Sequence, residues 1–209
     1  MPRQPAPGTR DKILGVASRL FYEHGVRAVG MSRIITEAGT GKNLLYQHFP
    51  TKSDLVAAYL EQAGERRRDA TRRALAEAGN GAAGAAGPAG QLVAVVAEVG
   101  RLVERPGFRG CAFRNYLAEF PDDDSGRPDE DGSVPAVAPA VVAREYLAGS
   151  RQLIEGLVAE LGVADPVRLT EQLWLLVDAL YVQAAYREPA DRHLGVEAAV
   201  ALAQRLVAV

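Results

Sequence analysis

Polar side chains that can read the edges of nucleic-acid bases gather in residues 42–49, KNLLYQHF. If this segment is helical, one of its faces carries four side chains: Asn43, Leu44, Gln47 and His48. An Asn or Gln amide can donate to and accept from the edge of one adenine, which gives roughly 1–3 kcal/mol of discrimination. A leucine on the same face suits contact with a thymine methyl group. The segment therefore predicts base recognition, and a solvated helix surface is the alternative for Gln47 and His48.

A pair of helices must position these side chains. Leu45 and Phe49 lie four residues apart on the opposite face, and Ile34 and Ala38 have the same spacing in the preceding segment. Gly39 stands where the chain must leave the first of these helices. Two helices joined by a short turn form a helix-turn-helix, whose second helix can enter the major groove of DNA. On spacing alone, an ordinary helical hairpin in an all-helical core fits equally well.

Two longer helices flank this pair. Residues 9–24 repeat apolar side chains at spacings of three and four, which predicts one apolar stripe along a helix. Thr9 is a suitable N-cap for this helix, and Gly25 ends it. After the pair, Thr51 is expected to cap a fourth helix that begins at Lys52. The first three helices together predict a small core.

The segment from residue 9 to about residue 60 closely resembles the N-terminal domain of the TetR family of bacterial transcriptional regulators. The matching features are the ILxxAxxLFxxxG helix, the Ala-Gly turn, the LYxHF of the third helix and the Lys-x-x-Leu opening of the fourth. The resemblance covers about a quarter of the chain. It implies an all-α fold of about nine helices. The implied domains are a three-helix helix-turn-helix DNA-binding domain (9–54) and a larger helical ligand-binding and dimerisation domain (55–209).

The resemblance also implies which residues contact DNA. Tyr46 and His48 match family positions that usually hold the phosphate backbone, and Lys52 matches another. Arg33, in the second helix, is expected to brace a phosphate or touch a flanking base. The full predicted set is Arg33, Thr40, Lys42, Asn43, Leu44, Tyr46, Gln47, His48 and Lys52.

Three residues depart from the family pattern. Gly30 stands where a capping Thr or Ser usually opens the second helix, and a glycine N-cap costs only a few tenths of a kcal/mol relative to those residues. Gly41 stands where a Ser often begins the recognition helix and binds a phosphate. Ile35 replaces a usual Ala, which implies a slightly different fit between the helices. The pattern therefore predicts fewer phosphate contacts than is usual in the family.

The resemblance implies three partners: double-stranded operator DNA, a small-molecule effector, and a second copy of the chain paired through the last two helices. The expected function is a ligand-responsive regulator, in the usual family case a repressor that an inducer releases from its operator. No catalytic residue and no enzymatic activity are expected. One alternative is a ligand-independent DNA-binding protein. The other is an enzyme built on the C-terminal body, for which Cys111 and His193 have no evident catalytic partner.

Charge divides the chain in a way that suits DNA binding. In residues 1–73 thirteen Lys and Arg residues stand against seven Asp and Glu residues, a net charge of +6, although the whole chain carries −2. A basic N-terminal part joined to an acidic remainder is typical of a polyanion-binding domain joined to a part that must not bind polyanions. The run Arg66–Arg68 lies far down the fourth helix and is expected to be a solvated face.

Composition excludes several other classes of site. A single cysteine leaves no disulfide framework, and three scattered histidines give no metal-ligand spacing, so no metal and no cofactor are expected. The Asp-rich residues 121–134 lack the spacing of an EF-hand and are expected to form a surface loop. No apolar run reaches the roughly 20 residues of a membrane span, so a cytoplasmic protein without membrane contact is expected.

The C-terminal part predicts a ligand pocket. After a Gly-rich connector at residues 79–90, residues 110–122 resemble a segment of one group of TetR-family ligand domains, which forms a short helix beside the inducer cavity. Aromatic side chains cluster there and on one face of the helix predicted at 166–186. The predicted pocket residues are Phe108, Cys111, Phe113, Tyr116, Trp174, Asp178 and Tyr181. Ordinary core packing is the alternative for each, and Trp174 suits a dimer interface equally well.

Overall fold

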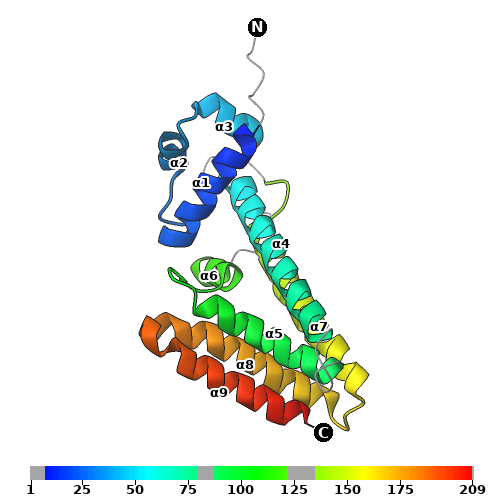
Figure 1. Cartoon of the computed structure of the whole chain (residues 1–209). Helices are drawn as coiled ribbons and strands as arrows, with labels where there is room; N and C mark the ends of the chain where they lie inside the picture. Colours follow the sequence, from blue (N-terminus) through cyan, green and yellow to red (C-terminus); the bar gives the residue numbers. More distant parts are fainter. Residues whose placement is uncertain (1–7, 80–86, 122–134, 209) are drawn as a thin grey trace. The chain divides into compact units, whose positions relative to one another are not determined.

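A computed structural model describes residues 8–79, 87–121 and 135–208, and these residues are all helical or loop, with no strand among them (Figure 1). The predicted all-α class is therefore confirmed. The helices are α1 Thr9–His24, α2 Met31–Ala38, α3 Lys42–His48, α4 Lys52–Gly79, α5 Pro88–Val103, α6 Ala112–Glu119, α7 Pro139–Leu161, α8 Pro166–Tyr186 and α9 Arg192–Val207, with a 3-10 turn η1 at Pro189–Asp191.

Contacts divide the chain into two compact units, residues 1–64 with 112–146, and residues 65–111 with 147–209. We call them unit one and unit two. The two units are defined by contacts between residues and not by function. The functional domains expected at 9–54 and 55–209 therefore remain a prediction. Among the described residues, no helix is long and apolar enough to cross a membrane.

The core of unit one forms where α1, α2 and α3 meet. Ile13 and Leu20 of α1, Ile34 of α2 and Leu45 of α3 have no exposed surface, and Phe49 after α3 is 2% exposed. These are the apolar positions that the spacing of three and four placed on one face of each helix. The helix-turn-helix is therefore held from within by its own apolar side chains.

Glycines set the ends of the short helices. Gly39 adopts the left-handed conformation, with φ 57° and ψ 41°, which a residue with a side chain adopts only at a cost. Gly30 and Gly41 are the N-cap residues of α2 and α3, and neither can supply a side-chain cap. The N-cap of α1 is Gly8, and Thr9 is its first helical residue. The expected N-cap role of Thr9 is therefore wrong by one position.

The start of α4 is fixed by a reciprocal cap. The Asp54 backbone N–H donates to Thr51 Oγ1 over 2.9 Å, and the Thr51 backbone N–H donates to Asp54 Oδ2 over 3.1 Å. This arrangement satisfies two backbone donors that a helix start would otherwise leave unpaired. The predicted capping role of Thr51 is therefore confirmed.

In unit two α5, α8 and α9 pack together. Gly100 lets α5 and α9 approach closely, because a Cβ at that residue would lie 2.4 Å from Val196 Cγ1. Leu92 of α5, Leu173 of α8 and Ala203 of α9 are at most 1% exposed. These three helices thus supply a large part of the core of unit two.

A buried carboxylate corrects one expectation about the basic run. Glu98 of α5 accepts from Arg67 Nη1 at 3.1 Å and from Arg101 Nε at 3.0 Å. The side chains of Glu98 and Arg67 are 7% and 14% exposed. Arg67 is therefore a packed ion-pair partner between α4 and α5 and does not belong to a solvated face. Charge in the sequence does not reveal which face of α4 the neighbouring helix will cover.

Some predicted boundaries also moved. The helix expected from about residue 91 begins at Pro88, since proline is well suited to the first turn. The helix expected from about residue 135 begins at Pro139. Most of the surface loop expected at 121–134 lies outside the described residues, as does the middle of the connector at 79–90.

Candidate nucleic-acid interface

The third helix separates a buried side from a readable side, as its spacing predicts. Leu45 is fully buried, whereas Asn43 and Gln47 are exposed and Leu44 is partly exposed. The two amides therefore lie on the surface of a rigidly anchored helix. An amide in this position can form the paired hydrogen bonds that distinguish adenine in the major groove.

The first turn of α3 brings a cation onto an aromatic ring. Lys42 Nζ lies 5.9 Å from the ring centroid of Tyr46, one helical turn later. Tyr46 is partly exposed. The contact places an ammonium group beside a phenol at the start of the helix. Both groups can donate to a phosphate oxygen.

Two other predicted contact residues have covered polar atoms. Thr40 Oγ1 and His48 Nε2 have almost no accessible surface and no hydrogen-bond partner among the described residues. Each residue as a whole is partly exposed. A phosphate contact by His48 would therefore use Nδ1 or require rotation of the ring. Lys52, the last residue of the predicted set, is the first residue of α4 and is partly exposed.

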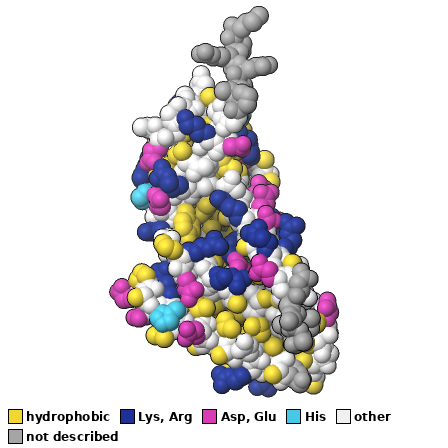
Figure 2. All heavy atoms as spheres, viewed as in Figure 1, with side chains coloured by type: hydrophobic (Ala, Val, Ile, Leu, Met, Phe, Trp, Pro, Cys, Tyr) yellow, Lys and Arg dark blue, Asp and Glu magenta, His cyan; other side chains and the backbone are white. Residues whose placement is uncertain are grey.

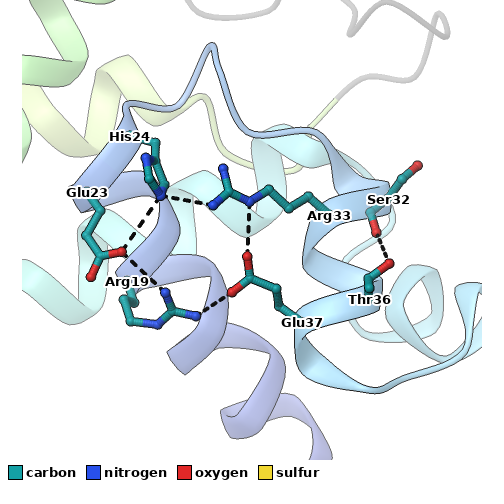
Figure 3. Close-up of polar contacts among 7 residues, drawn as sticks. All are labelled: Arg19, Glu23, His24, Ser32, Arg33, Thr36 and Glu37. Atoms are coloured by element: carbon teal, nitrogen blue, oxygen red, sulfur yellow. Dashed lines mark hydrogen bonds and ion pairs between the residues drawn. The ribbon is translucent and has the colours of Figure 1, made fainter.

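The predicted contact residue Arg33 is held by neighbouring side chains. Arg33 Nε donates to Glu37 Oε1 at 3.0 Å, and Arg33 Nη2 lies 3.0 Å from His24 Nε2. Glu37 also accepts from Arg19 Nη2 at 2.5 Å, so it links α1 to α2 (Figure 3). Because a guanidinium can only donate, the His24 nitrogen must accept. Arg33 is thus oriented by α1 and by its own helix.

This network shifts the ionisation of its members. Hydrogen bonds from Arg19, and then from Arg33, lower the pKa of Glu37 below its usual value. The hydrogen bond to Glu37 raises the pKa of Arg19. In Figure 2 the same region of α1 and α2 carries basic, acidic and histidine side chains side by side. The positive charge of Arg33 is therefore partly balanced by Glu37.

Sequence reasoning missed Arg10. Its guanidinium carbon lies 5.0 Å from the centre of the Phe49 ring, so the first turn of α1 places a cation beside the end of α3. Arg10 is exposed, and no carboxylate among the described residues forms an ion pair with it. Its separation of 39 positions from Phe49 gives no local pattern. A basic residue in the first turn of α1 was the available signal.

The predicted ligand-pocket residues fall in both units, and their grouping remains a prediction. In unit two the rings of Phe108 and Tyr181 lie 6.2 Å apart, and both residues are buried. In unit one Phe113 stacks on Tyr146 at 3.8 Å, and Tyr116 stacks on Phe120 at 4.9 Å. The other three predicted residues are in unit two: buried Cys111 and partly exposed Trp174 and Asp178.

A small cavity also lies in unit two, where α5, α8 and α9 meet. Its lining includes Val103, Leu180, Gln183, Arg187 and Arg192, and its volume is about 10 Å³. That volume holds about one water molecule and is far below the roughly 300 Å³ of the smallest usual ligand pockets. None of the predicted pocket residues lines it.

Apolar side chains remain uncovered on one side of α8. Val167, Leu175, Val182 and Tyr186 are 70%, 64%, 60% and 72% exposed. Their separations of eight, seven and four residues keep them within about 100° of one another around the helix. Leu194 and Leu202 of α9 are also exposed. Figure 2 shows hydrophobic side chains on the surface of the lower helices.

Comparison with known proteins begins with the N-terminal helices. The family model of bacterial regulatory proteins of the tetR family matches residues 13–59. An HTH-type transcriptional regulator of Staphylococcus aureus is 45% identical over 53 residues, which is 25% of this chain and 29% of that protein. The match therefore spans less than a third of the length of the curated relatives.

Solved structures extend the likeness to nearly the whole chain. A TetR-family transcriptional regulator from Streptomyces coelicolor is 29% identical, with a TM-score of 0.78 over 95% of this chain and 94% of that one. A transcriptional regulator from Saccharomonospora viridis, solved in complex with choline, is 20% identical, with a TM-score of 0.66 over 93% and 94% of the two chains. At that identity the second likeness concerns the fold alone. The helix-turn-helix of this chain is thus similar to that of the tetR family of bacterial regulatory proteins, and its whole fold is similar to that of a TetR-family transcriptional regulator.

Proposed function

We propose that the protein is a sequence-specific DNA-binding transcriptional regulator that acts as a homodimer and is released from its operator by a small molecule. The observation that carries the proposal is the division of α3, with Leu45 fully buried and the Asn43 and Gln47 amides exposed. A helix held by its core and presenting amides is suited to the major groove. Lys42, Tyr46 and Arg10 supply groups that can bind phosphates on either side.

The uncovered apolar side of α8 supports the homodimer. Leu175 and Val182 lie in the middle of this surface, each more than half exposed. Apolar surface of this kind is normally covered by a partner. A second copy would present the same residues to it, as two-fold symmetric dimers do. Two helix-turn-helix domains would then read two halves of a roughly palindromic operator.

The small-molecule effector is supported by the aromatic side chains of the predicted pocket and by the likeness to TetR-family regulators. Phe108 and Tyr181 are buried and in ring contact. The regulator of the same fold that was solved with choline shows that this fold can hold a small molecule. We expect the effector to favour a dimer whose DNA-reading helices no longer match the operator spacing. Repression is the expected outcome, as in the usual family case.

The test begins with selection of binding sites from a pool of random DNA duplexes by the purified full-length protein. Binding of the selected duplex is then measured by fluorescence anisotropy over a range of salt concentrations. The double variant Tyr46→Ala with His48→Ala should lose retention of this duplex and show a shallower salt dependence, because phosphate contacts release counterions. Arg73→Ala is the matched control, since it removes one exposed positive charge from α4 outside the proposed interface.

The two parts of the proposal fail in different ways. Unchanged retention in the Tyr46 and His48 variant would contradict the DNA interface. For the effector, compounds that raise the unfolding temperature are tested for release of the duplex. Stabilising compounds that never weaken DNA binding would favour a ligand-independent DNA-binding protein.

A further inference from the structure

The carboxylate of Glu119, at the end of α6, binds the turn that joins α1 to α2. Glu119 Oε2 accepts from the Arg27 backbone N–H over 2.9 Å, and Oε1 accepts from the Val26 N–H over 3.3 Å. These partners are separated by 92 and 93 positions in the sequence. One carboxylate thus satisfies two successive backbone donors just after the end of α1, where such donors lack helical partners.

Gly25 makes room for this carboxylate. Its φ is 84°, in the region that glycine adopts most readily. A Cβ at this residue would lie 2.8 Å from Glu119 Oε1, closer than side-chain carbons approach other atoms. Glycine is therefore needed here both for the backbone conformation and for the space that Glu119 occupies.

The side chain of Arg27 also contacts the end of α6. Its guanidinium donates to the backbone carbonyl of Glu119 and lies over the ring of Phe120, with Cζ 4.8 Å from the centroid. Phe120 stacks on Tyr116, which is 5% exposed in α6. The turn and the end of α6 are therefore joined by backbone, charge and aromatic contacts at once.

The turn determines where α2 begins. Val26 and Val29 within it are 5% and 0% exposed, so both ends of the turn are anchored in the core of unit one. α2 follows at Met31, and α2 packs on α3. A change in the turn would therefore alter the position of α2, and with it the surface that α3 presents.

We propose that Glu119 is a positioning residue for operator binding, through which α6 holds the helix-turn-helix in its DNA-binding arrangement. α6 begins at Ala112, directly after Cys111, where the first segment of unit two ends. Loss of the contact with Val26 and Arg27 would therefore weaken operator binding. This inference rests on the proposed function and names the contact through which α6 acts on it.

The direction of the change in DNA affinity distinguishes a positioning role of Glu119 from a purely electrostatic one. Glu119→Gln removes one negative charge from unit one, so charge alone predicts slightly tighter DNA binding. Loss of the carboxylate also removes an acceptor for one of the two N–H groups, because an amide offers only one oxygen. Positioning therefore predicts weaker binding of the operator. Glu61→Gln, at an exposed carboxylate of α4 in unit one, is the matched control for charge.

The experiment measures both variants as full-length dimers, after circular dichroism has confirmed their helical content. Binding of the selected operator duplex and of a scrambled duplex is measured at the same salt concentration. Glu119→Gln should weaken operator binding by roughly fivefold or more, the lower range of measured coupling between sites, with little change for the scrambled duplex. Glu61→Gln should leave the preference for the operator duplex unchanged. Operator binding by Glu119→Gln that equals or exceeds the wild type would overturn the proposal.

Hydrogen exchange supplies a readout that does not depend on DNA. In Glu119→Gln, exchange of the Val26 and Arg27 amides should accelerate, and the acceleration should extend into α2 and α3. Acceleration confined to the two amides would overturn the positioning role, because the helix-turn-helix would not depend on the contact. If the wild type selects no operator, the proposed function fails, and exchange in α2 and α3 still decides whether Glu119 positions them.

Discussion

Removal of the Glu98 carboxylate should destabilise the protein far more than loss of any exposed charge. The carboxylate is 7% exposed and binds Arg67, which is 14% exposed, and Arg101, which is 53% exposed. Glu98→Ala would remove the carboxylate that pairs with the largely buried Arg67 guanidinium. Breaking a buried ion pair in this way typically costs about 3–5 kcal/mol. The contact with Arg101 adds little, because exposed pairs contribute about 0–1 kcal/mol.

A double-mutant cycle tests this account of the ion pair. The cycle compares Glu98→Leu and Arg67→Met, each alone, with the two together. Apolar replacement of both partners should recover most of the stability that either single change loses, since a buried pair is often replaced without net cost. The free energy of unfolding is measured by urea titration at one protein concentration, because dimerisation would add a concentration term. Arg101→Ala serves as the exposed control. A cost for Glu98→Ala below about 1 kcal/mol, or strictly additive effects, would refute the reasoning.

Three further predictions concern the interface, the dimer and pH. Gln47→Ala should relax the selected consensus at one base pair by roughly 1–3 kcal/mol, and an unchanged consensus would exclude Gln47 as a reader. Leu175→Asp should give monomers in light scattering, because it places a charge in the apolar side of α8; a stable dimer would argue for another interface. The lowered pKa of Glu37 contributes stability that is present above the ordinary pKa of a glutamate, about 4.3, and is lost as the pH falls through the folded value. Glu37→Gln should therefore flatten the acid side of a plot of unfolding temperature against pH.

Local signals in the sequence predicted the helices well. The helix predicted at 166–186 has the bounds of α8, because proline and apolar spacing act within a few residues. The buried faces of α1 and α3 followed from the same spacing. The face that α3 presents could therefore be inferred from spacing alone, and the LYQHF segment indicated the family.

Contacts between distant residues could not be predicted in this way. Glu119 and Arg27 lie 92 positions apart, and no local pattern indicates that a carboxylate in one short helix will bind a turn in another. Arg67 was expected to be solvated, because charge runs usually face water, and only its ion pair with Glu98 of α5 shows otherwise. Arg33 was expected to be available to DNA, yet the structure places Glu37 and His24 within hydrogen-bond distance of its guanidinium.

The glycine N-caps of α2 and α3 have a consequence for the thermodynamics of recognition. The two helices have eight and seven residues, and neither has a side-chain cap. Isolated helices shorter than about 12–15 residues are marginal in water, so both depend on the core for their order. Part of the free energy of operator binding should be used to order these helices. The heat-capacity change of binding should therefore be more negative than that of two rigid partners. Gly41→Ser would add a cap before the complex forms, and calorimetry should then show a smaller entropic penalty.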